Sequence, residues 1–222
     1  MNTYSLIHSF YKEAMDEYLY ALYTKLIETH ALKGNLLEIG CGVGEISKRS
    51  AHWFAQVDAF DINKKMIQSA MAASSPSNIT FFTHDMHHPL KNQYSTIIAP
   101  IDVFNHCATE EAFIAIFNNW VHHLKAGGVM MFDLLRCEYL DSIIGYEESI
   151  NVNNTPYSWR VKKGDTRCSV IHEVTSNDTT ASHKEIAFNS ELVMDLINDF
   201  DLLELIALEE RTIYIIKKKT TS

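Results

Sequence analysis

The feature that most constrains the fold is the segment 36–45, which reads LLEIGCGVGE. A mostly apolar run, Leu36 to Ile39, leads directly into glycines at positions 40, 42 and 44. This pattern predicts a buried parallel strand that enters a tight loop before a helix. Glycine lets the backbone adopt positive φ and approach a ligand, and the amides of the next helix point toward that ligand. The segment therefore predicts a nucleotide-type site on the first strand-to-helix turn of a doubly wound α/β sheet.

The glycine spacing indicates the charge of the ligand. Loops that bind the pyrophosphate of a dinucleotide usually read G-x-G-x-x-G, but here the third glycine, Gly44, comes one residue early. Carboxylates flank the loop at Glu38 and Glu45. They suit a cationic ligand better than a diphosphate, so a dehydrogenase is the least favoured enzyme class. The sequence also has no G-x-x-x-x-G-K-[ST] phosphate loop.

Helical and strand patterns alternate through the first 135 residues. Apolar residues spaced by three and four predict a helical cap over residues 1–33. Strands are expected at 36–39, 57–61, 79–82, 95–99 and 129–134, with helices over 45–55, 63–73 and 109–124 and a turn at 124–128. This alternation predicts a parallel sheet. Asp61 ends the second strand, 21 residues after Gly40, where such folds hold a ribose through its hydroxyls.

The pattern changes after the fifth strand. Short β segments and turns over 157–189 predict an antiparallel meander, and we assign 135–189 to an inserted lid. On its 167–175 strand, His172 shares a face with Val170 and Val174. A helix near 190–199 and a hairpin of strands 202–208 and 212–217 complete a single domain over residues 1–222.

Composition and charge exclude several classes of protein. The chain is 46% hydrophobic and carries a formal net charge of −9, which argues against a nucleic-acid partner because phosphates require a basic face. The sequence has no run of 18 apolar residues and no signal-peptide pattern, so no membrane association is expected. Cys41, Cys107, Cys137 and Cys168 are scattered without a C-x-x-C motif. We expect four free thiols and a cytoplasmic protein.

Together these segments resemble the class I S-adenosylmethionine (SAM)-dependent methyltransferases, of the small-molecule type with a domain like methyltransferase domains 25 and 11. Residues 36–45 resemble the family's motif I, and 61–66 resemble its second motif. Asp85-Met86 resembles the pair that contacts adenine, and 124–133 resembles the L-K-P-G-G entry to strand five, with Ala126 in place of proline.

The resemblance implies a Rossmann-like doubly wound sheet of seven strands. The sheet would be mostly parallel, with an antiparallel last strand and the order 3-2-1-4-5-7-6. It also implies SAM as the cofactor. The expected cofactor-binding residues are Glu38, Gly40, Cys41, Gly42, Gly44, Asp61, Ile62, Met66, Asp85, Met86 and Ala99.

Candidate acceptor-binding residues follow the fourth strand, because ligands of open α/β sheets lie beyond the carboxyl ends of the strands. Asp102, Asn105 and His106 lie in this segment, and His106 could act as a general base near neutral pH. Asp102 is a second candidate catalytic residue. The alternative is that these polar residues cap the next helix or face water. Tyr11 resembles a pocket-lining tyrosine of small-molecule members, but it could equally be a core aromatic.

The histidines close together in the sequence do not predict a metal site. His84, His87 and His88 fall in one loop, but their spacing matches no helical zinc motif. Solvated loop histidines are the simpler interpretation, so we expect no metal. The sequence thus favours methyl transfer from SAM to a nitrogen or oxygen atom of a small molecule. The alternatives are a protein or RNA methyltransferase and a non-catalytic SAM-binding subunit, and a homodimer is compatible with the sequence.

Overall fold

A seven-stranded sheet forms the centre of the molecule, seen here in a computed structural model that describes residues 17–152 and 154–220. Its strand order is β10-β11-β5-β4-β1-β2-β3. The strands are β1 (Asn35–Ile39), β2 (Gln56–Asp61), β3 (Ile79–Thr83), β4 (Tyr94–Ala99), β5 (Leu124–Leu135), β10 (Phe200–Ala207) and β11 (Arg211–Lys218). β1 to β5 pair in parallel, whereas β11 is antiparallel to both of its neighbours. The fold class and strand order implied by the resemblance are confirmed.

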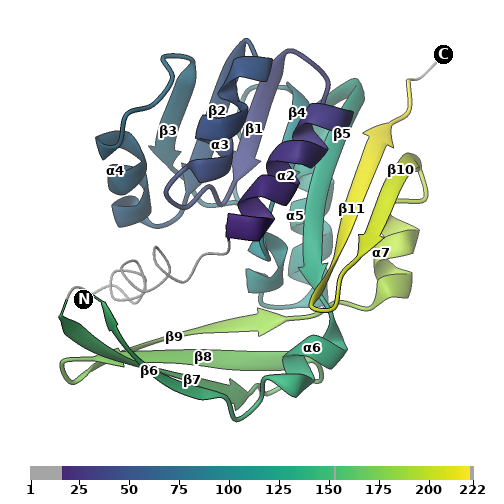
Figure 1. Cartoon of the computed structure of the whole chain (residues 1–222). Coiled ribbons are helices and arrows are strands. Elements are labelled where there is room, and N and C mark those ends of the chain that lie inside the picture. The colour runs from purple at the N-terminus through teal and green to yellow at the C-terminus, as the bar shows by residue number, and fades with distance from the viewer. Residues whose placement is uncertain (1–16, 153, 221–222) are drawn as a thin grey trace.

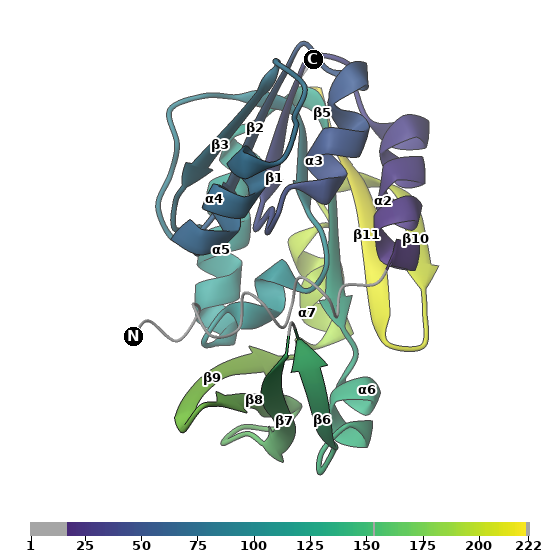
Figure 2. The ribbon, with the colours of Figure 1, turned by 60° about the vertical axis from the view of Figure 1, so that its left-hand side comes forward.

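Helices cover both faces of this sheet (Figure 1). They are α2 (Glu17–His30), α3 (Glu45–Ser50), α4 (Lys64–Ala72), α5 (Glu110–His122) and α7 (Ser190–Leu196), with 3-10 turns η1 (Ala51–Trp53) and η2 (Val103–His106). Tyr23 of α2 and Ile46 of α3 share one buried cluster, and Phe117 of α5 and Val193 of α7 share another. Figure 2 shows α2 and α3 on the opposite side of the sheet from α5.

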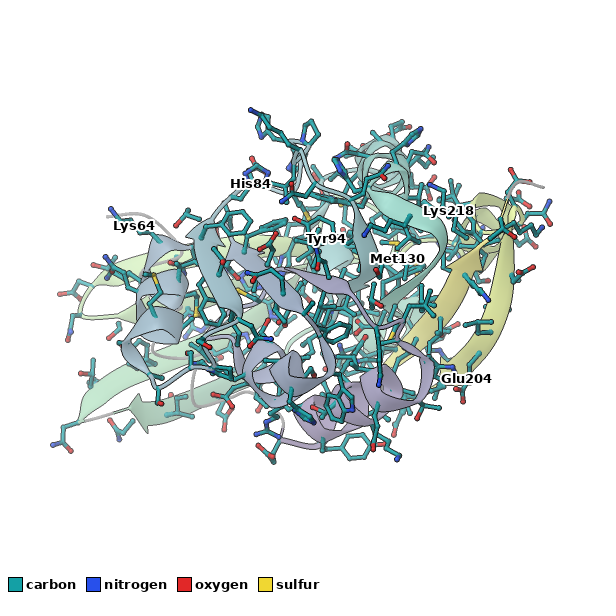
Figure 3. All side chains as sticks on the ribbon, turned by 90° about the horizontal axis from the view of Figure 1, so that it is seen from above. Lys64, His84, Tyr94, Met130, Glu204 and Lys218 are labelled. Carbon is teal, nitrogen blue, oxygen red and sulfur yellow. A yellow bond between two sulfur atoms is a disulfide. The ribbon has the colours of Figure 1, made fainter. Side chains whose placement is uncertain are left out.

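The central strands are buried because helices cover them on both faces. Leu36, Leu37 and Ile39 of β1 are fully buried, which explains the continuous apolar run in the sequence. In Figure 3, the side chains of Tyr94 and Met130 lie in the interior, whereas Lys64 and Glu204 lie toward the margins.

The chain adds β2 and β3 on one side of β1 and then crosses to add β4 on the other side. Leu36 of β1 pairs with Val57 of β2 on one side and with Thr96 of β4 on the other. The helices that follow β1 and β4, α3 and α5, lie on opposite faces of the sheet. The loops after these two strands therefore separate and leave a crevice at the carboxyl edge of the sheet.

The start of β5 differs from the expectation. Residues 124–128 were expected to form a turn, but Leu124 already pairs with Tyr94, and the register shifts before Val129 pairs with Thr96. Gly127 adopts φ 73° at this irregularity. The segment is therefore an irregular beginning of the strand, which glycine permits because it lacks a Cβ atom.

The inserted lid is a second antiparallel sheet of four strands, β6 (Glu147–Val152), β7 (Thr155–Lys163), β8 (Ser169–Ser176) and β9 (Thr179–Ile186), preceded by α6 (Cys137–Ser142). Figure 1 shows it beyond the edge at which the parallel strands end. Val170, His172 and Val174 are buried on one face, as the alternation predicts. The sequence did not reveal β6, because its acidic, mostly exposed residues carry no apolar alternation.

One expectation about the cysteines is wrong. Cys41 and Cys107 are buried free thiols, but Cys137 and Cys168 form a disulfide. The bond joins α6 to the residue before β8, two segments that are 31 residues apart in the sequence. Sequence spacing could not predict this pairing because it depends on how the lid folds. No helix in the described part of the chain is long and apolar enough to cross a membrane.

Candidate functional site

A cavity of about 250 Å³ occupies the crevice between the loops after β1 and β4. It is bordered on the sheet side by the ends of β1 and β2 and by the loops at 84–87 and 100–106, and on the lid side by β9. The predicted residues that border it are Glu38, Gly40, Cys41, Gly42, Asp61, Ile62, Met66, Asp85, Met86, Asp102 and His106. Residues from distant parts of the sequence therefore meet in one cavity.

All three glycines of the loop, at positions 40, 42 and 44, have positive φ angles, and the surroundings of Gly42 and Gly44 differ. Gly42 has φ 54°, and a Cβ atom there would have no other atom within 4 Å, so this position leaves room for a ligand in the cavity. Gly44 has φ 79°, and a Cβ atom there would lie 2.5 Å from the ring of Phe81. Gly44 does not border the cavity. The structure shows close packing of Gly44 on Phe81 of β3, and its expected role in cofactor binding stays a prediction.

Asp61 fixes the glycine loop in place. Its Oδ2 atom accepts a hydrogen bond from the Gly42 amide at 3.0 Å, and its Oδ1 atom accepts one from the Asn63 amide at 2.7 Å. Burial raises the pKa of Asp61, and the two amide bonds act in the opposite direction. Each carboxylate oxygen keeps a second lone pair, so the group can still accept hydrogen bonds from ligand hydroxyls.

Glu38 lies at the end of β1, beneath the loop. It is 2% exposed, and the Ser47 hydroxyl donates a hydrogen bond to its Oε2 atom. Burial raises the pKa of Glu38 to about 8, although the bond from Ser47 opposes the shift. A carboxyl group with this pKa is mainly protonated at neutral pH. A cation close to it would favour its ionised form.

Asp85 and Met86 border the cavity from the loop after β3. The backbone amide of His87 donates to the Asp85 carboxylate at 3.0 Å, and its ring nitrogen lies 2.7 Å from the same oxygen. Partial burial alone would raise the pKa of Asp85, but these contacts with His87 lower it. Trp120 holds the adjacent Met86 carbonyl through its indole N–H at 3.1 Å. The loop thus presents an ionised carboxylate beside an apolar side chain.

A buried aspartate organises the loop after β4. The amides of Ile101 and Asp102, which both have positive φ, donate to Asp133 at 2.7 and 2.8 Å. Tyr23 also donates to Asp133, and Arg211 bridges Asp133 and Asp102. Burial raises the pKa of Asp102 to about 6, with Arg211 opposing the shift. Asp102 borders the cavity but its charge is engaged by Arg211.

Two further predicted residues do not border the cavity. Asn105 is fully buried, donates to the Ile186 carbonyl at 2.7 Å and accepts from the Leu135 amide at 3.0 Å. Its expected substrate contact is wrong, because this amide is used to join the loop to the sheet and the lid. Ala99 is fully buried within β4. The predicted Tyr11 lies outside the described residues, as does part of the expected 1–33 cap.

Imidazoles from two elements meet on the acceptor side of the cavity. His106 of η2 is exposed, and its ring centroid lies 5.3 Å from that of His183 of β9. His183 Nε2 lies 3.3 Å from Glu185, and His172 of β8 contacts the other oxygen of Glu185 at 3.0 Å. Burial lowers the pKa of His183. Burial opposes ionisation of Glu185, but bonds from His172 and His183 hold its pKa well below the usual value.

The sequence analysis did not identify His183 and Glu185, or Tyr20 of α2, which also borders the cavity. The only signal was alternation, since His183 and Glu185 are two residues apart and therefore lie on one face of the strand. That signal could not show that this face meets His106. The complete arrangement has fixed backbone amides and carboxylates at one end and imidazoles at the other.

The chain is similar in sequence to known methyltransferases. Residues 36–128 match the model of a family described as a methyltransferase domain. YqeM of Bacillus subtilis (strain 168), whose name assigns it provisionally to the methyltransferases, is 28% identical over 176 residues, which cover 75% of this chain and 70% of that protein.

Solved structures with similar folds include two methyltransferases. A SAM-dependent methyltransferase from Clostridium acetobutylicum superimposes with a TM-score of 0.77 at 17% identity and covers 98% of this chain and 100% of its own. CalS10, an amino pentose methyltransferase from Micromonospora echinaspora solved with SAM, gives a TM-score of 0.71 at 15% identity over 94% of each chain. These likenesses show the fold of the chain.

Proposed function

We propose that this chain is a class I SAM-dependent methyltransferase and that it transfers the methyl group of SAM to a nitrogen or oxygen atom of a small molecule. The observation that carries the proposal is the fixed unit of Gly42 and Asp61, joined at 3.0 Å on the cavity wall. Gly42 lets a ligand approach the backbone closely, and the Asp61 carboxylate can accept hydrogen bonds from ribose hydroxyls. A nucleoside that carries a charged chain requires both.

The cavity residues offer partners for each part of SAM. Asp61 would accept hydrogen bonds from the ribose hydroxyls, and Asp85 with Met86 would receive the adenine. Gly42 leaves room for the methionine part, whose ammonium and sulfonium charges would favour ionisation of Glu38. SAM brings an activated methyl group on its sulfonium, so the protein mainly has to align donor and acceptor.

A small acceptor fits the lid and the charge of the protein. β9 packs against η2, and His183 of β9 borders the cavity beside His106, so an acceptor in the cavity would lie against both the lid and this loop. The net charge of −9 does not favour a nucleic-acid acceptor. Structural neighbours named as an amino pentose methyltransferase and as the N-methyltransferase NodS from Bradyrhizobium japonicum make an amine acceptor a reasonable first test.

His106 is the candidate proton acceptor in this reaction. It borders the cavity from η2, and its exposure lets it exchange protons with water. Removal of a proton from the acceptor provides the lone pair that attacks the methyl carbon in line with the sulfur. The carbon–sulfur bond then breaks, and its electron pair stays on sulfur. Asp102 supports the adjacent loop through Arg211 and does not take the proton.

The test combines binding with a screen for acceptors. Calorimetry of the full chain with SAM and with NAD should show binding of SAM alone. Incubation with radiolabelled SAM and pools of small amines and hydroxyl compounds should then give labelled product, and His106→Ala should reduce labelling without loss of SAM binding. Folded protein that does not bind SAM would refute the proposal. Labelling of added protein or RNA, with no small-molecule product, would contradict the assigned class of acceptor.

A further inference from the structure

We propose that His106, His183 and Glu185 form a binding site for a divalent transition-metal ion on the acceptor side of the cavity. Their candidate ligand atoms all lie within 4.8 Å of one another. They come from η2 and β9, two elements that pack together although His106 is 77 residues before His183. This proposal replaces the expectation, drawn from histidines close together in the sequence, that the protein holds no metal.

The pair on β9 already has the separation that two ligands of one ion require. His183 Nε2 and Glu185 Oε1 are 3.3 Å apart. Nitrogen and oxygen ligands lie about 2.0–2.2 Å from such ions, so neighbouring ligands are about 3 Å apart. His106 completes the set by a small inward movement, which its exposed side chain on a short 3-10 turn allows.

A second layer of side chains holds the carboxylate in position. Trp159 donates from its indole Nε1 to His172 Nδ1 at 3.1 Å. An indole N–H only donates, so His172 Nδ1 must accept and its Nε2 carries the proton. That Nε2 donates to Oε2 of Glu185 at 3.0 Å. One oxygen of Glu185 is therefore fixed by hydrogen bonds, and Oε1 is oriented toward His183 and the proposed ion, as outer-layer partners orient metal ligands elsewhere.

The site is also restrained by packing. The ring of His172 stacks on that of His183, with centroids 4.8 Å apart and planes 7° apart. The side chains of His183 and Glu185 are only 5% and 7% exposed. A purely structural hydrogen-bond network would explain these buried groups. It would not explain why the network ends at the cavity wall beside a third, exposed imidazole.

The donor set indicates which ions would bind. Two imidazoles and one carboxylate suit Mn²⁺, Fe²⁺, Co²⁺ and Zn²⁺, whereas Ca²⁺ and Mg²⁺ prefer oxygen ligands. Three protein ligands leave coordination positions open toward the cavity. A small molecule with two neighbouring donor atoms, such as a vicinal diol, an amino alcohol or a hydroxy acid, could occupy them.

A role of the bound ion in methyl transfer deepens the proposed function and rests on it. A coordinated hydroxyl group loses its proton to water more readily, because the cation stabilises the oxyanion. The oxygen then forms a bond to the methyl carbon, the carbon–sulfur bond breaks, and the electron pair remains on sulfur. With the ion bound, His106 serves as a ligand, and coordination replaces its role as proton acceptor.

Metal binding can be measured without knowing the acceptor. The full chain, first treated with chelator, is titrated with Co²⁺ and Zn²⁺ by calorimetry, and Co²⁺ is followed by its visible absorption. We expect one ion per chain, about tenfold or more weaker binding in His106→Ala and Glu185→Gln, and binding about 10–100-fold weaker in His172→Ala. His52→Ala is the matched control, because this exposed histidine lies on η1, away from the cavity, and it should bind as the wild type does.

The outcomes separate this proposal from the proposed function. No Co²⁺ binding, or equal binding by wild type and His106→Ala, would overturn the metal site, and since His106 is exposed, that variant should fold. SAM binding measured on the same samples tests the cofactor site independently. Once an acceptor is known, activity that is lost on chelation and restored by Zn²⁺ or Mn²⁺ supports the metal site. Activity unchanged by chelation contradicts its role in the reaction.

Discussion

Arg211 Nη1 lies 2.9 Å from Asp102 Oδ1, although 109 residues separate the two in the sequence. The same guanidinium nitrogen lies 3.1 Å from Asp133, so the first residue of β11 holds the loop after β4 at the wall of the cavity. Both aspartates and the arginine are largely buried. The cavity loop therefore depends on a strand near the end of the chain.

Replacement of Arg211 by methionine should destabilise the protein strongly. It would leave the buried carboxylates of Asp102 and Asp133 without their cation, and loss of one partner of a buried ion pair typically costs about 3–5 kcal/mol. Urea denaturation at neutral pH measures the change. Arg160→Met is the control, because the Arg160–Glu147 pair is exposed and worth about 1 kcal/mol at most. Equal losses in the two variants would refute a special role for Arg211.

Replacement of Asp61 by alanine should weaken SAM binding by about 1–3 kcal/mol, because the ligand loses charge-assisted hydrogen bonds and the Gly42 amide loses its anchor. Calorimetry measures the affinity, and circular dichroism checks that the variant is folded. Asp201→Asn, an exposed change on β10, is the control. Wild-type affinity in Asp61→Ala would exclude the ribose contact.

SAM affinity should rise with pH up to about 8 because of Glu38. Its pKa is raised to about 8 by burial, and a cationic ligand binds best to the ionised form, so binding at lower pH must release a proton. Asp61, Asp102, His106 and His183 also border the cavity. The comparison is therefore with Glu38→Gln, in which the part of the pH dependence due to Glu38 is removed. Identical profiles for both proteins would contradict this role.

The same shift has a consequence for stability. Glu38 is protonated in the fold at pH values where an unfolded chain, with a pKa near 4.5, is ionised. Its contribution to the free energy of unfolding is therefore full below about pH 4.5 and declines as the pH rises to about 8. Denaturation of ligand-free wild type across this range should show a steeper decline than Glu38→Gln. A decline of equal slope would show that Glu38 ionises normally.

The glycines of the loop should respond differently to alanine. In Gly44→Ala, the new Cβ atom lies 2.5 Å from Phe81, and alanine must also adopt a positive φ angle. We therefore expect a loss of about 2–4 kcal/mol in unfolding free energy. Gly42→Ala meets no atom within 4 Å and should cost about 1–2 kcal/mol, but its methyl group would intrude on the ligand. Thermal denaturation and SAM titration separate these effects. The reverse ranking of stability would refute the packing argument.

Alkylation should distinguish two classes of cysteine. In denaturant without reductant, iodoacetamide should label Cys41 and Cys107 only, because Cys137 and Cys168 are joined. With reductant, all four should react, and mass spectrometry counts the labels. Reduction should also lower the stability of the lid, by about 2–4 kcal/mol in the usual range for a loop of this kind. Four labels without reductant would restore the original expectation of free thiols.

The local patterns in the sequence were sufficient for the fold of the main sheet. The apolar run 36–39, the glycines after it and Asp61 at the end of the next strand predicted β1, the loop and β2. The strand order, which the family resemblance implied, is confirmed. Such patterns are readable because a strand covered on both faces must be continuously apolar. The edge strand β6, which is mostly exposed, carries no such pattern and was missed.

The candidate site was predictable only where it is built from these local patterns. Asp85 and His106 border the cavity because each lies in the segment that follows a strand at the same edge of the sheet. Asn105, one residue from His106, is instead buried in a structural network. Neighbouring side chains on a short 3-10 turn point in different directions, and the sequence does not show which one packs inward.

The sequence by itself determined the doubly wound sheet, the glycine loop and the carboxylate that follows the second strand, because these depend on residues near one another in the chain. The tertiary structure decided the rest. It paired Cys137 with Cys168, placed Arg211 on Asp102, and brought His183 and Glu185 to His106. These contacts arise from packing of the lid and the last hairpin on the sheet, and no short-range pattern encodes which faces of distant elements meet.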